Sequence, residues 1–143
     1  MGRVSFALVL GAFAIAGMTL ARHDDHDKGK PKVKALSAVD IAEKIDGKKA
    51  KATTVELTLE PGQASAPHRH PGPVFGYVLE GEYEWAIDDN EAKILKVGDT
   101  FYEPTGRLHR VSKNPSKKNK TRILAVVLHP ADVKDIVIPE KKK

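Results

Sequence analysis

The chain has 143 residues, 41% hydrophobic and 30% charged, a size and balance typical of one globular domain rather than two. It contains no cysteine, which excludes a disulfide framework, a thiol nucleophile and a thiolate metal site. The formal net charge is +5, but the lysine clusters contain no interleaved aromatic residue, so we interpret them as solvated loops and expect no nucleic-acid partner.

Residues 1–21 have the pattern of a signal peptide. Arg3 precedes an apolar run over residues 4–20, and a charged stretch follows directly after Ala21. Cleavage after Ala21 predicts an exported protein, periplasmic or secreted, with no stable membrane anchor. The alternative is that the apolar run is retained as an anchor.

A polar segment follows the presequence. Residues 22–36 are dominated by charged residues, glycine and proline, which predicts a disordered linker. Within it, His23 and His26 lie among aspartates, and a weak metal site there is the less favoured alternative to a solvated linker. Residues 140–143 form a basic tail, so the expected domain spans residues 37–139.

Residues 37–45 place apolar side chains at helical offsets behind Ser37, a pattern that fits either a short helix or an edge segment. Farther along, polar and apolar side chains alternate in short runs that Gly, Pro and Asp separate. The strands expected from this pattern cover residues 53–59, 74–79, 83–87, 92–97, 100–103 and 110–112. A final apolar run over residues 123–128 suits a strand buried on both faces. Many short strands without a long helix predict an all-β sandwich or barrel.

Three histidines are candidate metal ligands. His68 and His70 are two residues apart, so in an extended segment both imidazoles point to one face. His109 follows the turn around Pro104 and Gly106 and belongs to a distant strand. Three imidazole nitrogens bind a divalent metal and leave coordination positions open. The alternative is that the histidine pair is a solvated loop without ligand function.

The two segments that carry these histidines resemble the two motifs of the cupin superfamily. From Gly62 to Gly81 the sequence reads G-x5-H-x-H-x10-G, and from Gly98 it reads G-x5-P-x-G-x2-H, with Asn114 five residues beyond His109. The resemblance covers residues 53–129 and implies a single-domain jelly-roll barrel, or double-stranded β-helix.

The resemblance also implies an acidic metal ligand seven residues before Gly81, where this chain has Val74. Another residue must then supply the acidic ligand, and Glu103 is favoured over Glu82 and Glu84. The predicted metal ligands are His68, His70, His109 and Glu103. Ligand type does not discriminate among zinc, iron(II), manganese, copper and nickel.

Other aromatic and histidine side chains receive different interpretations. His129 follows the last expected strand and is placed outside the cluster. Trp85 or Tyr102 is expected to line an apolar ligand pocket at the barrel mouth. The strand over residues 53–59 is expected to be an unpaired edge that extends the sheet of a second copy, which predicts a homodimer.

These observations favour an exported small cupin-barrel protein that binds a divalent transition metal, a small-molecule ligand, or both through its three histidines. The alternative is a metal-dependent enzyme of the oxygenase, isomerase or hydrolase type that acts on a small organic molecule. No catalytic residue is assigned, and the acid missing at Val74 favours binding over turnover. A third possibility is a barrel whose histidines bind nothing specific.

Overall fold

The structure of the chain, a computed structural model, describes residues 29–141. The expected signal peptide, His23 and His26 lie outside these residues. The ten strands are β1 (Lys32–Ile45), β2 (Lys48–Leu59), β3 (His68–Arg69), β4 (Val74–Glu80), β5 (Glu82–Ile87), β6 (Lys93–Lys96), β7 (Thr100–Glu103), β8 (His109–Lys113), β9 (Thr121–Pro130) and β10 (Ile138–Pro139). Every strand expected from the sequence is present, with bounds shifted by at most five residues.

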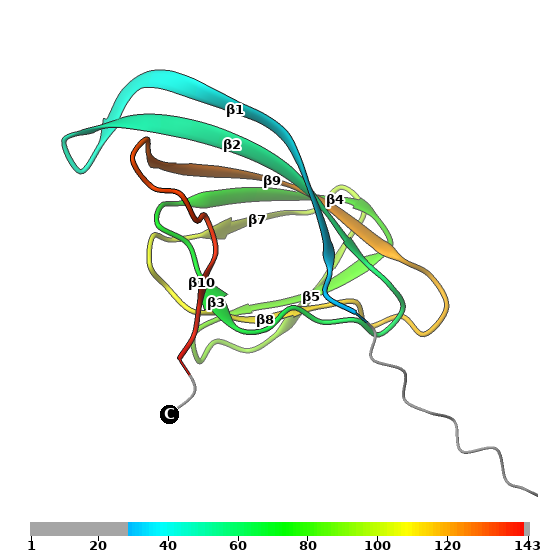
Figure 1. The fold of residues 1–143 in the computed structure, drawn as a ribbon. Coiled ribbons are helices and arrows are strands. Elements are labelled where there is room, and N and C mark those ends of the chain that lie inside the picture. The colour runs from blue at the N-terminus through cyan, green and yellow to red at the C-terminus, as the bar shows by residue number, and fades with distance from the viewer. Residues whose placement is uncertain (1–28, 142–143) are drawn as a thin grey trace, which may run out of the picture.

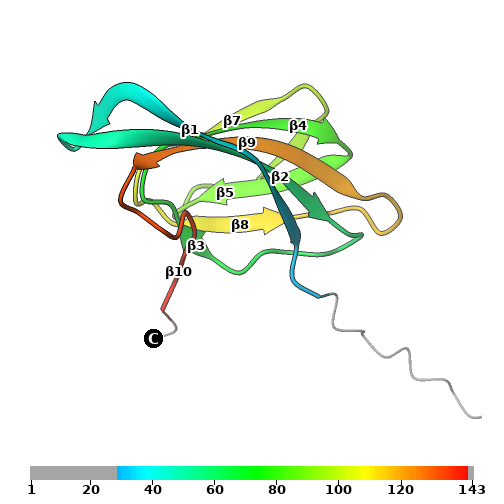
Figure 2. The same cartoon turned by 45° about the horizontal axis from the view of Figure 1, so that its top comes forward.

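Two five-stranded sheets form a barrel, as Figures 1 and 2 show. One sheet has the order β1-β2-β9-β4-β7 and the other the order β10-β3-β8-β5-β6. All pairings between these strands are antiparallel. The predicted all-β jelly-roll class is therefore confirmed. Within residues 29–141 the search for a membrane-spanning helix finds none.

The short helix considered for residues 37–45 is wrong, because these residues belong to β1, a long edge strand paired with β2. Asp46 and Gly47 connect the two strands, with φ angles of 51° and 73°. Two successive residues with positive φ make the tight hairpin turn that Asp-Gly favours. This dipeptide was the sequence signal for a hairpin. β1 begins at Lys32, so it also occupies part of the segment expected to be a disordered linker.

The expected edge at residues 53–59 is also corrected. These residues lie in β2, which pairs with β1 on one side and β9 on the other. The free edges of this sheet are β1 and β7. At the C-terminus, Glu140 was assigned to the basic tail, yet both its carboxylate oxygens accept hydrogen bonds from Arg69, at 2.9 and 3.1 Å.

The packed core lies between the two sheets. Its fully buried members are Leu59, Val78, Tyr83 and Ile123, with Phe101 and three other side chains packed against them. Across the β4–β7 pair, Gly76 lies opposite Phe101, and a Cβ added to this glycine would be 1.9 Å from the phenyl ring. Gly76 is therefore required because the ring occupies the space of its missing side chain. Tyr83 connects this core to the histidines, since its hydroxyl lies 3.3 Å from His109 Nε2.

Candidate functional site

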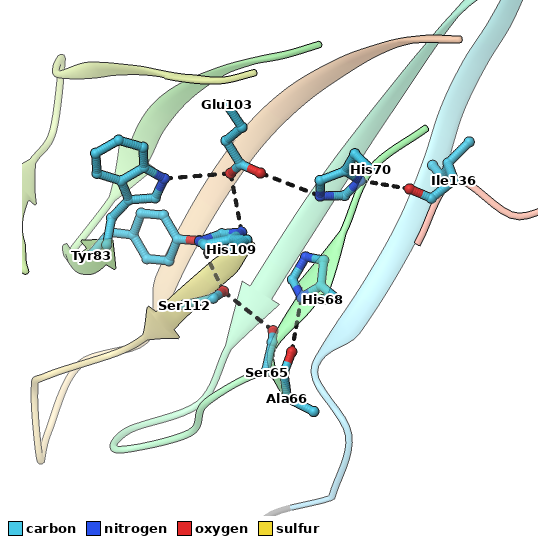
Figure 3. A network of polar contacts seen from close by, with 10 residues as sticks. Ser65, Ala66, His68, His70, Tyr83, Glu103, His109, Ser112 and Ile136 are labelled. Carbon is cyan, nitrogen blue, oxygen red and sulfur yellow. Dashed lines mark hydrogen bonds and ion pairs between the residues drawn. The ribbon is translucent and has the colours of Figure 1, made fainter. Parts of the chain in front are cut away.

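Strand pairing brings the three predicted histidines together. His68 in β3 is the direct partner of His109 in β8, and His70 follows one residue after β3 ends. One nitrogen of each imidazole lies within 4.8 Å of the others. The ring centroid of His68 is 4.9 Å from those of both His70 and His109. The expected convergence of imidazoles from two distant segments is present, as Figure 3 shows.

A carboxylate joins the histidines from the strand beside Val74. Val74 in β4 pairs directly with Glu103, the last residue of β7. Only 4% of Glu103 is exposed; its Oε1 lies 3.1 Å from His109 Nδ1 and its Oε2 lies 3.4 Å from His70 Nε2. Strand β7 thus supplies, directly beside Val74, the carboxylate that Val74 itself lacks.

The two other acidic candidates do not reach the cluster. Glu82 is exposed, and Glu84 forms a salt bridge with Lys113, whose Nζ lies 3.3 Å from Oε2. On the opposite sheet, His129 Nδ1 donates to the carbonyl oxygen of Pro130 at 2.9 Å, and Nε2 accepts a hydrogen bond from Thr53 at 2.8 Å. His129 is therefore a buried structural residue outside the cluster, as predicted.

Backbone carbonyls determine the tautomers of His68 and His70. A carbonyl oxygen only accepts, so a ring nitrogen bonded to one must carry the proton. His68 Nδ1 donates to Ala66 O at 2.8 Å, and His70 Nδ1 donates to Ile136 O at 2.6 Å. Each ring therefore presents an unprotonated Nε2. In His70 this nitrogen is the atom that faces Glu103.

A chain of hydroxyl groups determines the tautomer of His109. Ser112 Oγ donates to Ser65 Oγ at 3.3 Å, and the Tyr83 hydroxyl donates its proton to Ser112 at 2.9 Å. The Tyr83 oxygen then accepts from His109 Nε2, which lies 3.3 Å away. In the neutral ring with its proton on Nε2, the remaining nitrogen, His109 Nδ1, carries a lone pair that faces Glu103. Figure 3 shows this network.

Charge at the cluster follows from burial and contact. Burial, reinforced by the neighbouring His109 and His70, lowers the pKa of His68 to about 4, and burial also lowers the pKa of His70. Burial opposes ionisation of Glu103, but a hydrogen bond from His109 and the charges of His109, His70 and His68, all of which act when these rings are protonated, place the pKa of Glu103 below its usual value. At neutral pH a carboxylate therefore faces the neutral imidazoles of His68 and His70.

Two buried atoms of the cluster have no hydrogen-bond partner. They are Glu103 Oε2 and His109 Nδ1, since the short distances across the cluster do not have hydrogen-bond geometry. Lone pairs of Glu103, His70 and His109 face one another without a proton between them. A buried arrangement of this kind is unfavourable in itself and is neutralised by a cation. Three imidazoles and one carboxylate therefore fit a divalent metal.

The cluster forms one wall of a cavity of about 430 Å³ that is partly open to solvent. Phe101 and Tyr83 line this cavity, whereas Trp85 and Tyr102 do not. The expectation for the latter two residues was wrong. Tyr102 follows Phe101 in β7, so it points to the opposite face, where it is 49% exposed and contacts Phe75. Trp85 lies at the edge of the cluster, with Nε1 3.4 Å from Glu103 Oε1.

Asn114, part of the second motif, has a structural function. Its side chain is completely buried, and Nδ2 donates to the carbonyl oxygens of Leu59, Glu60 and Asn119 at 3.1, 3.1 and 2.8 Å. Oδ1 accepts from the Ser116 amide at 2.9 Å. The residue therefore joins the loop after β8 to the end of β2.

Comparison with known families and structures assigns the chain. The model of the cupin domain matches residues 55–127, which include both histidine segments. The chain belongs to the cupin superfamily. A search of curated proteins found no match for this cupin.

Solved structures share its fold. An uncharacterised double-stranded β-helix protein from Klebsiella pneumoniae has a TM-score of 0.57 and 20% identity, over 78% of this cupin and 87% of that chain. A Cupin 2 conserved barrel domain protein from Salinispora arenicola has a TM-score of 0.53 and 20% identity, over 71% of this cupin and 76% of that chain.

The DMSP lyase DddQ from Ruegeria pomeroyi has a TM-score of 0.53 and 20% identity, over 79% of this cupin but 54% of the lyase. At these identities the likeness establishes the fold alone.

Proposed function

We propose that this cupin binds one divalent transition metal through His68, His70, His109 and Glu103 and holds a small organic ligand beside it. The observation that carries the proposal is the set of facing lone pairs, in which Glu103 Oε2 and His109 Nδ1 lack any partner. The hydrogen bonds of His68 and His70 to backbone carbonyls give each ring a fixed orientation and a free Nε2. Such supporting contacts are typical of metal-binding histidines.

The ligand set restricts the metal by its chemistry. Three imidazoles and one carboxylate without a thiolate suit zinc, iron(II), manganese, copper or nickel, and the set does not choose between them. When bound, the metal would act as a Lewis acid toward an oxygen donor of the ligand. Glu103 would also balance part of the metal's charge, because it is the one carboxylate among the described residues that line the cavity.

The alternative function is a metal-dependent enzyme that acts on a small molecule. It is supported by the cavity, which reaches the histidines and would place a bound molecule beside the metal. The fold is also that of an enzyme, the lyase DddQ. The buried hydroxyl of Tyr83 beside His109 does not supply a general base, however, because burial strongly raises the pKa of Tyr83 and keeps it protonated. Binding therefore remains the favoured function.

Metal analysis tests the proposal. The purified protein is loaded with zinc, passed through a desalting column and analysed for metal content. We expect about one zinc per chain in the wild type, none in His68→Ala and about one in His129→Gln, a histidine variant outside the cluster. Circular dichroism checks that both variants are folded. Equal zinc content in all three proteins would place the metal elsewhere and refute the proposed site.

Turnover is tested separately with the loaded protein. Conversion of any member of a panel of small esters, enols and phenols, or dioxygen uptake in their presence, would favour the enzyme. Activity must then disappear in His68→Ala. Stoichiometric metal without conversion would favour the binding protein.

We also propose that the mature protein is exported, on the basis of the pattern in residues 1–21. Mass spectrometry of the protein recovered from periplasm or medium tests this. A mature N-terminus at Arg22 supports export with cleavage, and an intact N-terminus in the cytosol would contradict it.

A further inference from the structure

We propose that the ligand of this cavity is an uncharged, mainly apolar organic molecule, larger than a single aromatic ring, that carries one oxygen donor directed at the histidine cluster. The inference rests on the proposed metal site for its polar end. It rests on the lining, charge and size of the cavity for the rest of the molecule.

The cavity wall is apolar in three separate parts of the chain. From the β2–β9–β4 sheet come inward-facing side chains of alternate residues, among them Val55, Val74 and Val127. The C-terminal segment adds Ile136 and Val137, and the N-terminal end of the described chain adds further apolar groups. Most of the surface that a ligand meets is therefore aliphatic, which favours an apolar body of similar shape.

The cavity offers little to a charged or highly polar ligand. Among the described residues that line it, Lys30 is the one basic residue other than histidine, and it is exposed to solvent. The hydroxyls of Tyr83, Ser112 and Ser65 already bond to one another. A polyol or an ionic group placed away from the histidines would lose its water without gaining partners, which costs several kcal/mol. Only the end beside the cluster accommodates a polar atom.

The volume sets a lower limit on the size of the ligand. A closed apolar cavity of roughly 150 Å³ is sufficient for benzene. The cavity here is about 430 Å³, so a single ring would leave much of the apolar wall without contacts. A ring with a short alkyl chain, or a branched molecule of equivalent size, fills it better. The polar end faces the cluster of His68, His70, His109 and Glu103 because a metal held there would accept its oxygen donor.

Three probes test the ligand class: 4-propylphenol, propylbenzene, which lacks the oxygen, and xylitol, a polyol with as many nonhydrogen atoms as the phenol. Binding is measured by calorimetry on zinc-loaded and on chelator-treated protein. We expect the loaded protein to bind 4-propylphenol about tenfold or more tighter than propylbenzene, since only the phenol has an oxygen donor for the metal. Chelation should bring the two affinities close together, and xylitol should not bind.

A pair of substitutions on β9 locates the binding. Ala125 lines the cavity, whereas its neighbour Val126 is not part of the wall and pairs with the exposed residue Phe75. Ala125→Phe should lower the affinity for 4-propylphenol about tenfold or more because the new ring occupies the cavity, with zinc content unchanged. Val126→Phe, which adds the same ring to the outer face, should bind the phenol as the wild type does.

The two proposals fail in different ways. Stoichiometric zinc together with absent 4-propylphenol binding, or with equally tight xylitol binding, would overturn the ligand class and leave the metal site intact. Absent zinc would overturn the metal site. In that case propylbenzene binding that Ala125→Phe weakens would still support the apolar part of the inference, and its absence would overturn that part too.

Discussion

Replacing Glu103 by glutamine should have opposite effects on the metal-free and the metal-bound protein. The carboxylate accepts hydrogen bonds but donates none, and it faces the unprotonated nitrogens His70 Nε2 and His109 Nδ1 at 3.4 and 3.1 Å. The amide group of Glu103→Gln has two N–H donors and nearly the same shape. In the metal-free protein it gives His109 Nδ1 a partner and removes a buried negative charge whose Oε2 lacks a hydrogen bond.

The size of this effect follows from the two unpartnered atoms. Each buried polar group without a hydrogen bond costs about 1–3 kcal/mol. Relief of part of this cost predicts that Glu103→Gln stabilises the metal-free protein by about 2 kcal/mol. For a domain of this size that corresponds to a melting temperature about 8 °C higher.

Zinc should remove the advantage of the variant. Loss of a charged ligand is expected to weaken zinc binding at least about 100-fold. At free zinc about 1,000 times the wild-type Kd, the wild type gains ~4 kcal/mol, whereas a variant that binds 100-fold more weakly gains ~1.4 kcal/mol. The wild type should then be at least as stable as Glu103→Gln. Thermal unfolding in chelator and in zinc measures both states.

The control is Glu84→Gln, which removes a carboxylate that is paired with Lys113 outside the cluster. It should change the melting temperature little in either condition, because partly exposed ion pairs contribute about 0–1 kcal/mol. A lower melting temperature of Glu103→Gln in chelator would refute the reasoning, because it would mean that a histidine proton already satisfies the carboxylate.

Three further predictions concern the barrel itself. Gly76→Ala places a methyl group against the ring of Phe101 and should destabilise the protein by about 1–3 kcal/mol in urea unfolding; an unchanged midpoint would show that the ring can move freely. Asn114→Ala removes a buried amide that bonds to three carbonyl oxygens and should lower the free energy of unfolding in urea by about 2–4 kcal/mol. A loss below about 1 kcal/mol would show that the connection between the loop after β8 and the end of β2 does not depend on this side chain. The predicted homodimer should be visible by light scattering and should dissociate in Val39→Asp, because Val39 is 55% exposed on the edge strand β1; a monomeric wild type would contradict it.

Most strands from β2 to β8 were predictable because they alternate polar and apolar side chains between turn residues, and β9 was predictable from its apolar run. The two-residue strand β3 was not among the expected strands. β1 was not, because the apolar residues of positions 37–45 fit a helix as well as a strand. Its partner β2 is what makes it a strand, through hydrogen bonds that a pattern of single residues does not contain. The Asp46–Gly47 turn was the local signal, and it indicates the hairpin only when both flanking segments are considered together.

The sequence also did not predict which aromatic side chains face the interior of the barrel. Phe101 and Tyr102 are adjacent, so one must face inward and the other outward, and alternation does not say which. The register of β7 against β4 decides it, because Gly76 leaves room for the inward ring of Phe101.

By itself the sequence determined the all-β class, the turns that separate most strands and the three histidines of the cluster, since these depend on residue type and spacing along the chain. Only the tertiary structure decided that Glu103 stands beside them in place of Val74, because the acid comes from a paired strand 29 positions along the chain rather than from the same segment. It also decided where the ring protons lie, since Ala66, Ile136 and Tyr83 belong to different segments that meet only in the folded barrel.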